Sequence, residues 1–257
     1  MRILVLVKEV PDSYGERRLN LTTGRADREA SEKVLDEITG RAVEAAVSFA
    51  ESGGEAEVQL LTMGPASAEA MLRKTLAMGA DGAYHVVDDR LAAADMTLTS
   101  EVLAAAARHI GFDLLIAGDA SSDGAAGIVP AMVAERLGVP HLTSLDELQI
   151  AESGVTGRRA TYGGTFALSA PLPAVVSVTE RMPDPRFPGF KGIMSAKKKP
   201  LETLTLDDLG VDPQADVPRS IMLSVSETPP RTGGEKITDE GDAGRQLADY
   251  LAQERLV

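Results

Sequence analysis

The sequence predicts an α/β fold with a mostly parallel sheet that helices cover on both sides. β-branched and leucine residues form five runs without polar alternation, which is typical of strands buried on both faces. These runs are Ile3–Val7, Val58–Met63, Ala83–Val87, Leu114–Ala117 and Ala174–Val178. Apolar residues at helical spacing lie between them, over 38–49, 70–78, 102–110 and 128–137. The alternation favours right-handed βαβ units of a doubly wound sheet, whose ligands bind beyond the carboxyl ends of the strands.

The pattern changes after Leu145. Three short strand-like runs, over 148–151, 155–161 and 165–169, are separated by Gly-containing turns and predict a small antiparallel hairpin appended to the sheet. Four prolines between 181 and 202 exclude a central strand or a continuous helix there. We predict one α/β domain over residues 1–212. From Pro213, Pro-Pro, Gly-Gly and many charges predict an extended C-terminal arm over 213–257 that ends in a helix.

The composition of the 257 residues excludes several classes of function. A net charge of −13 argues against nucleic acid as a partner, and the absence of cysteine excludes thiolate nucleophiles, iron–sulfur clusters and cysteine zinc sites. The three histidines are scattered and no carboxylates stand at ligand spacing, so we predict neither catalytic residues nor a metal site. The N-terminal apolar run is too short for a signal or a membrane span, which indicates a cytoplasmic or organelle-matrix protein.

The segment GDASSDGAAG, Gly118–Gly127, is the first candidate site. It follows a buried strand and precedes a helix, and its small residues let a ligand approach backbone N–H groups that favour phosphate. A tight turn with Asp123 as N-cap is the structural alternative. The segment matches neither the dinucleotide fingerprint nor the P-loop. The turn Met63–Pro65 lies at the same predicted edge and is explained more simply as a strand-to-helix turn set by proline.

The segment Arg181–Lys199 has the opposite charge to the rest of the chain. It holds six Lys or Arg residues against Asp184 alone. It also carries four large apolar residues among prolines and glycines, where we expect no regular element to bury them: Phe187, Phe190, Ile193 and Met194. A basic rim around apolar anchors suits docking to a partner protein. A solvated lysine run that caps a strand at 201–204 is the alternative.

Seven motifs in order along nearly the whole chain resemble the β subunit of electron transfer flavoproteins, of the FixA-like type. They are VKEVPD from Val7, DEITGRAVEAA from Asp36, MGPA from Met63, LRKTLAMGADGAYHV from Leu72, the loop at Gly118, LPAVVSV from Leu172 and GIMSAKKKPLE from Gly192, with DLGV after it. The most specific is the pair AMGAD and IM-x-AKKK. The resemblance implies a HUP-like, adenine-nucleotide-binding fold.

The resemblance also implies a function. Such a β subunit forms a heterodimer with an α subunit that holds most of a redox-active FAD, and it buries AMP as a structural ligand. Electrons are expected to arrive from acyl-CoA-type dehydrogenases, as in fatty acid β-oxidation, and to leave for a membrane quinone oxidoreductase. The chain is then a carrier subunit and not an enzyme.

The resemblance assigns two sets of binding residues. The implied AMP contacts are Leu6, Asp36, Glu37, Ile38, Thr39, Met63, Gly118, Asp119, Ala120, Ser121, Ser122, Asp123, Gly124, Ala125, Ala126, Gly127, Ile128 and Val129. The implied partner-recognition loop spans 181–200, with docking residues Phe187, Phe190, Ile193, Met194, Lys197, Lys198 and Lys199. The C-terminal arm is expected to contact the α subunit.

Three positions depart from the family pattern. Gly127-Ile128-Val129 replaces polar side chains, so backbone N–H groups would hold the phosphate. Asp36 begins a helix entry that lacks an Asn-Pro-aromatic sequence, and its carboxylate would repel phosphate unless it faced ribose or adenine. Ala160 stands where some relatives have a Glu thought to influence the mobile FAD domain.

Two alternatives stay open. A bifurcating relative would hold a second FAD in place of AMP, since both ligands present an AMP moiety to the same loop. A stand-alone adenine-nucleotide binder of the stress-protein type would share the sheet but would not need the basic segment or the arm. An ATP-pyrophosphatase would want a Ser-Gly-Gly-x-Asp-Ser turn after its first strand, where this chain reads KEVPDS.

Overall fold

The computed structural model of the chain describes residues 1–215, 220–230, 233–234 and 236–257. They form two compact units, Met1–Leu223 and Ser224–Val257. The predicted C-terminal helix is α6 (Ala243–Gln253), which buries no residue and ends before Leu256. Among the described residues, no helix combines the length and the apolar character needed to cross a membrane.

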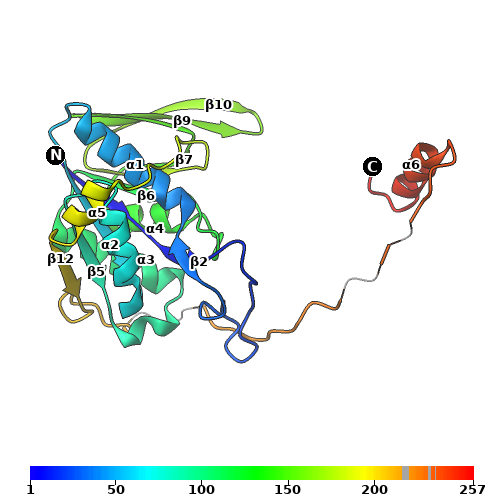
Figure 1. Ribbon diagram of the computed structural model, residues 1–257, viewed down its shortest axis with the longest axis horizontal. Helices are drawn as coiled ribbons and strands as arrows, with labels where there is room; N and C mark the ends of the chain where they lie inside the picture. Colours follow the sequence, from blue (N-terminus) through cyan, green and yellow to red (C-terminus); the bar gives the residue numbers. More distant parts are fainter. Residues whose placement is uncertain (216–219, 231–232, 235) are drawn as a thin grey trace. The chain divides into compact units, whose positions relative to one another are not determined.

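A seven-stranded sheet forms the centre of the first unit (Figure 1). Its order is β12-β5-β4-β1-β6-β11-β7, and every neighbouring pair is parallel. The strands are β1 (Arg2–Leu6), β4 (Glu57–Met63), β5 (Gly82–Val86), β6 (Leu114–Gly118), β7 (His141–Leu145), β11 (Ala174–Val178) and β12 (Leu201–Leu204). The predicted fold class, a parallel α/β sheet, is therefore confirmed.

The strand order places a switch point next to β1. The chain runs outward from β1 to β4 and β5, and then returns to add β6 on the other side of β1. Val5 accordingly pairs with Leu60 on one side and with Ile116 on the other. Loops that leave neighbouring strands in opposite directions leave a crevice between them, so the carboxyl ends of β1 and β6 are the place to look for a ligand.

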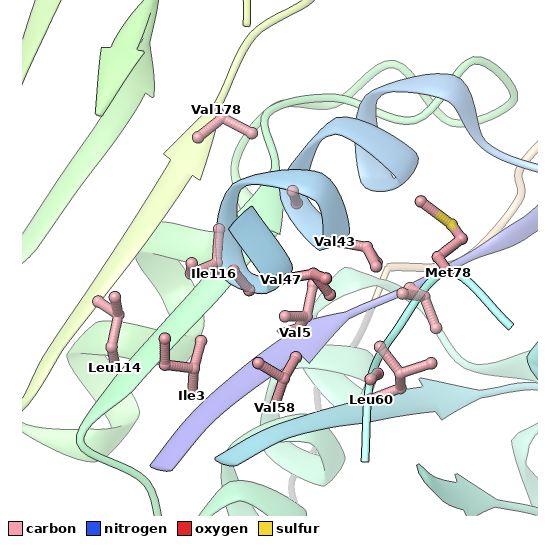
Figure 2. Close-up of a cluster of buried hydrophobic side chains, with 14 of the residues drawn as sticks. Ile3, Val5, Val43, Val47, Val58, Leu60, Met78, Leu114, Ile116 and Val178 are labelled. Atoms are coloured by element: carbon pink, nitrogen blue, oxygen red, sulfur yellow. The ribbon is translucent and has the colours of Figure 1, made fainter. Parts of the chain in front are cut away.

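Two pairs of helices cover the sheet. α1 (Glu37–Glu51) and α2 (Glu69–Leu76) share one buried cluster with one face of the strands, and α3 (Met96–Ile110) and α4 (Val129–Leu137) share a second cluster with the other. Figure 2 shows Ile3, Val5 and Ile116 pointing toward Val43 and Val47 of α1. Short 3-10 turns precede α2 (η1, Ala66–Ala68) and α3 (η2, Asp89–Ala93). Successive strand residues face opposite sides, which explains the uninterrupted apolar runs.

Two smaller sheets complete the unit. The predicted hairpin is a three-stranded antiparallel sheet of β8 (Glu147–Ala151), β9 (Gly154–Thr161) and β10 (Gly164–Pro171), in the order β10-β9-β8. It packs Val155 and Ala170 into the first core cluster. β2 (Glu9–Pro11) pairs with β3 (Lys33–Leu35) and closes an excursion, residues 12–32, that leaves the carboxyl end of β1.

Helix α5 and strands β2, β3 and β7 were not predicted from the sequence. The short helix α5 (Phe190–Ala196) forms between Pro188 and Pro200, but Phe190, Ile193 and Met194 on it stay exposed, so the expectation that no regular element buries them is confirmed. Prolines exclude a helix through their own positions and leave a seven-residue stretch free to form one. Strand β7, at the edge of the sheet, was not predicted, because its sequence HLTSL has only two apolar residues and its Thr-Ser pair leaves neither an apolar run nor a strict alternation.

Candidate functional site

The candidate site is the loop over residues 118–128, which joins the end of β6 to α4 at the switch point. A Cβ at Gly118 would lie 3.1 Å from side-chain atoms of Ile38 and Thr39 and 3.2 Å from the Thr39 nitrogen. The first turn of α1 therefore lies directly against the start of the loop. The structure thus brings together two of the sequence-predicted groups, the helix entry at Asp36–Thr39 and the small-residue loop.

Two carboxylates hold the loop in place, the half-buried Asp119 and the buried Asp36. Asp119 accepts hydrogen bonds from the hydroxyls of Ser144 (2.8 Å) and Ser177 (3.1 Å), which lie on β7 and β11. Asp36, only 2% exposed, accepts from the backbone N–H of Ser122 (2.9 Å) and caps α1 through the Thr39 N–H (3.4 Å). The Asp36 carboxylate therefore holds protein N–H groups.

Cations of the N-terminal segment hold the outer part of the loop. Lys8, just after β1, donates to Asp123 (2.6 Å) and to the Ser121 hydroxyl (2.9 Å). Arg28 binds the other Asp123 oxygen through two nitrogens, at 2.7 and 3.0 Å, and Arg17 donates to the Ser122 carbonyl (2.8 Å). Two cations thus bind the Asp123 carboxylate, and a third, Arg17, binds the backbone of the residue before it.

The Asp123 carboxylate is ionised in this arrangement. Its side chain is only 3% exposed, and this burial raises its pKa. The hydrogen bond and charge of Lys8, with the Ser121 hydroxyl and Arg28, outweigh the burial and hold the Asp123 pKa well below its ordinary range.

The later part of the loop presents backbone donors. Ala125 and Gly127 have positive φ angles, of 49° and 63°. Within the described residues, the N–H groups of Ala126, Gly127 and Ile128 form no hydrogen bond, and no side chain caps the start of α4. Exposed N–H groups at a helix start form a site for an anion. The residues present therefore fit a phosphate group.

The remaining predicted AMP positions lie at the same sheet edge. Leu6 is buried at the end of β1, and Met63 ends the neighbouring strand β4. Glu37 pairs with Arg41 on the next turn of α1, and its side chain is largely exposed. Lys8 directly follows a strand in the VKEVPD motif, so the sequence places it at the edge where a ligand is expected. Arg17 and Arg28 were not predicted, because no pattern in the sequence marks them.

The basic segment is anchored where α5 meets α2. A Cβ at Gly192 would lie 2.4 Å from the Ala77 carbonyl oxygen, so only glycine permits this approach. Arg73 of α2 donates to the Lys199 carbonyl at 2.8 Å. The Lys199 ammonium donates to the carbonyls of Leu76 and Ala80, and burial lowers its pKa. The AMGAD motif at the end of α2 therefore packs against the GIMSAKKK motif of α5 and the residues after it.

The outer face of the segment stays in solvent. Phe187 is 97% exposed and Phe190 is 80% exposed, while Ile193 and Met194 are about half exposed. Lys191, Lys197 and Lys198 are exposed and make no ion pair within the described residues. Contiguous exposed aromatic and aliphatic side chains beside unpaired cations are typical of a protein interaction site.

The three histidines lie on three different elements of the structure. His85 is buried in β5, His109 lies late in α3, and His141 begins β7. Burial lowers the pKa of His85. In the part of the chain that the structure describes, no group of three His, Asp or Glu side chains has a geometry that could hold a metal ion.

The fold and the loop define a class of protein, a parallel α/β protein with a loop at the switch point whose free N–H groups suit an anion. Comparison with known proteins narrows the class. The electron transfer flavoprotein domain model matches residues 23–209. The chain belongs to the electron transfer flavoprotein family.

Several similar proteins are named as the β subunit of an electron transfer flavoprotein. The chain is 46% identical over 264 residues to the electron transfer flavoprotein subunit beta of Mycobacterium leprae, with 99% of both chains covered. It is 30% identical over 259 residues to the protein of the same name from Bacillus subtilis, with both chains covered completely. It is 34% identical over 243 residues to the caffeyl-CoA reductase-Etf complex subunit CarD of Acetobacterium woodii, covering 93% of this chain and 92% of that one.

Proposed function

We propose that the chain is the β subunit of a heterodimeric electron transfer flavoprotein that binds AMP structurally in the loop over 118–128. The observation that carries this proposal is the coincidence of unpaired loop N–H groups with three nearby cations at the switch point. A phosphate placed on Ala126–Ile128 receives donors without displacing a protein bond. The AMP in this role orders the loop and takes no part in redox chemistry.

The proposed cofactor arrangement assigns FAD mainly to the α subunit. FAD supplies the redox chemistry of the complex when it is bound. This chain contributes the nucleotide loop, the docking segment and, through its C-terminal arm, contacts with the α subunit. It acts as a carrier subunit without catalytic residues of its own, and we assign it to the cytoplasm.

The proposed partners are acyl-CoA-type dehydrogenases as electron donors and a membrane quinone oxidoreductase as the acceptor. The exposed Phe187 and Phe190, with Ile193 and Met194 beside them, fit an apolar recess on a donor protein. Lys197 and Lys198 stand free to meet acidic groups around such a recess.

Nucleotide content tests the proposal. The chain is co-expressed with its α-type subunit, the purified complex is denatured, and the released nucleotides are measured per heterodimer. One FAD and one AMP support the proposal, and two FAD identify a bifurcating complex. An adenine nucleotide bound to this chain in the absence of any flavoprotein complex would identify a stand-alone binder.

The docking role is tested with Phe190→Ala in the heterodimer. Truncation of an exposed apolar anchor removes about 2 kcal/mol of binding free energy and leaves the core intact. We expect the apparent KM of an acyl-CoA dehydrogenase for the flavoprotein to rise about thirtyfold, with unchanged flavin content. An unchanged rate at subsaturating flavoprotein would remove this segment from docking.

A further inference from the structure

The segment that follows β11 is bound to α1 just before its first exposed aromatic residue. Arg186 makes a forked contact with Glu44 at 2.8 and 2.9 Å and donates its backbone N–H to the same carboxylate at 3.0 Å. It also reaches both Glu51 oxygens, at 2.8 and 2.7 Å, and the Ser48 hydroxyl at 3.2 Å. Phe187, the next residue, is 97% exposed.

The acceptors of Arg186 form one row on a rigid helix. Glu44, Ser48 and Glu51 follow one another at spacings of four and three, which places them on the same face of α1. The residues just before two of these acceptors, Val43 and Val47, pack into the first core cluster, so α1 is fixed on the sheet. A guanidinium has the fork of donors that this row requires, whereas a lysine ammonium does not.

A second contact reinforces the first. Arg41, also on α1, donates to the Met182 carbonyl and pairs with Asp184 at 2.6 Å. A Cβ at Gly40 would lie 3.4 Å from Pro185, so the proline ring lies close on the helix surface. Residues 182–186 are therefore fastened along α1.

The fastening gives Arg186 a role distinct from that of the other cations in the segment. The Arg186 charge is paired with carboxylates of this chain. Its hydrogen bond to Glu44 is the chief cause that lowers the pKa of Glu44 to about 2. Lys191, Lys197 and Lys198 keep theirs exposed. Arg186 is thus unsuited to meet a partner directly, and what it determines is where the chain leaves α1.

We infer that Arg186 is a positioning residue, which holds Phe187 and the start of α5 in the geometry that a docking protein meets. The inference rests on the proposed docking function. Two exposed aromatic residues in a Pro- and Gly-rich stretch have no packing of their own to order them. Anchoring at Arg186, with α5 packed on α2 at the other end, removes much of the ordering entropy that a free loop would lose on binding.

The experiment uses the complete heterodimer with Arg186→Gln, Arg186→Lys, Glu44→Gln and, as control, Arg158→Gln. Arg158 is an exposed arginine on β9, and its ion pair with Glu147 is long, at 3.9 Å. Two quantities are measured: the kinetics with an acyl-CoA dehydrogenase of the same organism, and the rate of chymotrypsin cleavage after Phe190. Bound FAD and AMP are quantified in each variant.

We expect Arg186→Gln to raise the apparent KM for the flavoprotein about tenfold, with kcat, FAD and AMP unchanged and faster cleavage after Phe190. The apparent KM and the cleavage rate of Arg186→Lys should lie between those of the wild type and those of Arg186→Gln. Glu44→Gln should raise both the apparent KM and the cleavage rate. Arg158→Gln should match the wild type.

Three outcomes would overturn the inference. Cleavage after Phe190 that is no faster in Arg186→Gln and Glu44→Gln would mean that the contact does not order the segment. Faster cleavage without a change in KM, in an assay where Phe190→Ala does raise KM, would mean that order is irrelevant to docking. If Phe190→Ala leaves KM unchanged as well, the proposed docking function itself fails.

Discussion

The candidate loop over 118–128 and the basic segment Arg181–Lys199, the proposed docking segment, are held in different ways. At the loop, Asp36, Asp119 and Asp123 each bind partners distant in sequence, and the N–H groups of residues 126–128 remain unpaired among the described residues. The docking segment is held at Arg186, Gly192 and Lys199 and leaves apolar side chains in solvent. A polar ligand needs free N–H groups in a fixed place, whereas a protein partner needs apolar area that is ordered before contact.

Because the two regions share no residue, each can be disrupted separately, and the largest effect is expected at the loop. Gly127→Glu puts a side chain at a φ of 63°, which costs about 1–2 kcal/mol, and an acid against the phosphate. The lost AMP removes a further contribution of about 3 kcal/mol at a hundredfold excess of ligand over Kd. We expect a heterodimer without AMP and with strongly lowered unfolding free energy in urea.

Gly138→Glu is the matched control for this change. Gly138 has a φ of 69° and no atom within 4 Å of an added Cβ, so the substitution carries the backbone strain alone. Its AMP content should equal that of the wild type. An AMP-loaded, normally stable Gly127→Glu heterodimer would contradict the placement of the phosphate.

A smaller loss of unfolding free energy is expected when the Asp36 carboxylate, which binds both the loop and the start of α1, is removed. Asp36→Ala deletes the α1 cap and leaves the Ser122 N–H without its acceptor, for a cost of about 2 kcal/mol. Asp95→Ala is the control, because Asp95 caps α3 through Leu98 and accepts from the Ser220 N–H, away from the loop. Denaturant unfolding should show a similar loss of unfolding free energy in the two variants, and only Asp36→Ala should release AMP faster than the wild type. Equal AMP release rates would separate Asp36 from the ligand site.

The docking segment can be loosened at its other end. Gly192→Ala places a Cβ 2.4 Å from the Ala77 carbonyl oxygen and forces α5 away from α2, at a cost of about 1–3 kcal/mol. Gly189→Ala, where an added Cβ meets nothing within 4 Å, should be neutral. Dehydrogenase kinetics should show a raised apparent KM for Gly192→Ala only, with AMP unchanged in both. A wild-type KM for Gly192→Ala would show that docking tolerates a displaced α5.

The smallest effect concerns pH. The hydrogen bond from Arg186, aided by Ser48 and opposed by burial, lowers the pKa of Glu44 from 4.5 to about 2. The folded state therefore binds fewer protons than the unfolded state, so this contribution is complete above pH 4.5 and fades as pH falls toward 2. Glu44→Gln should be less stable than the wild type by about 1–2 kcal/mol at pH 7, with a gap that narrows below pH 4.5. A gap that is constant with pH would exclude the Glu44 charge as its source.

Much of the architecture was predictable because burial leaves a direct mark on the sequence. The central strands are apolar on both faces, so their runs stand out, and the four covering helices repeat at a helical period. The edge strand β7 was not predicted because the sheet covers it only in part. The short helix α5 was not predicted because it is too short and too exposed to show a helical repeat of apolar residues. The position of the candidate loop was also predictable, since parallel strands end at the same edge.

The sequence by itself determined the α/β class, the position of the small-residue loop and the charge reversal of the docking segment, because each follows from residue type and local order. The tertiary structure decided which charged side chains are paired with other groups of the same chain. Asp36 reaches Ser122 across 86 positions, Lys8 reaches Asp123 across 115, and Arg186 reaches Glu44 across 142. Spacing along a chain carries no information about such pairs, because only the order of strands in the sheet brings their elements together.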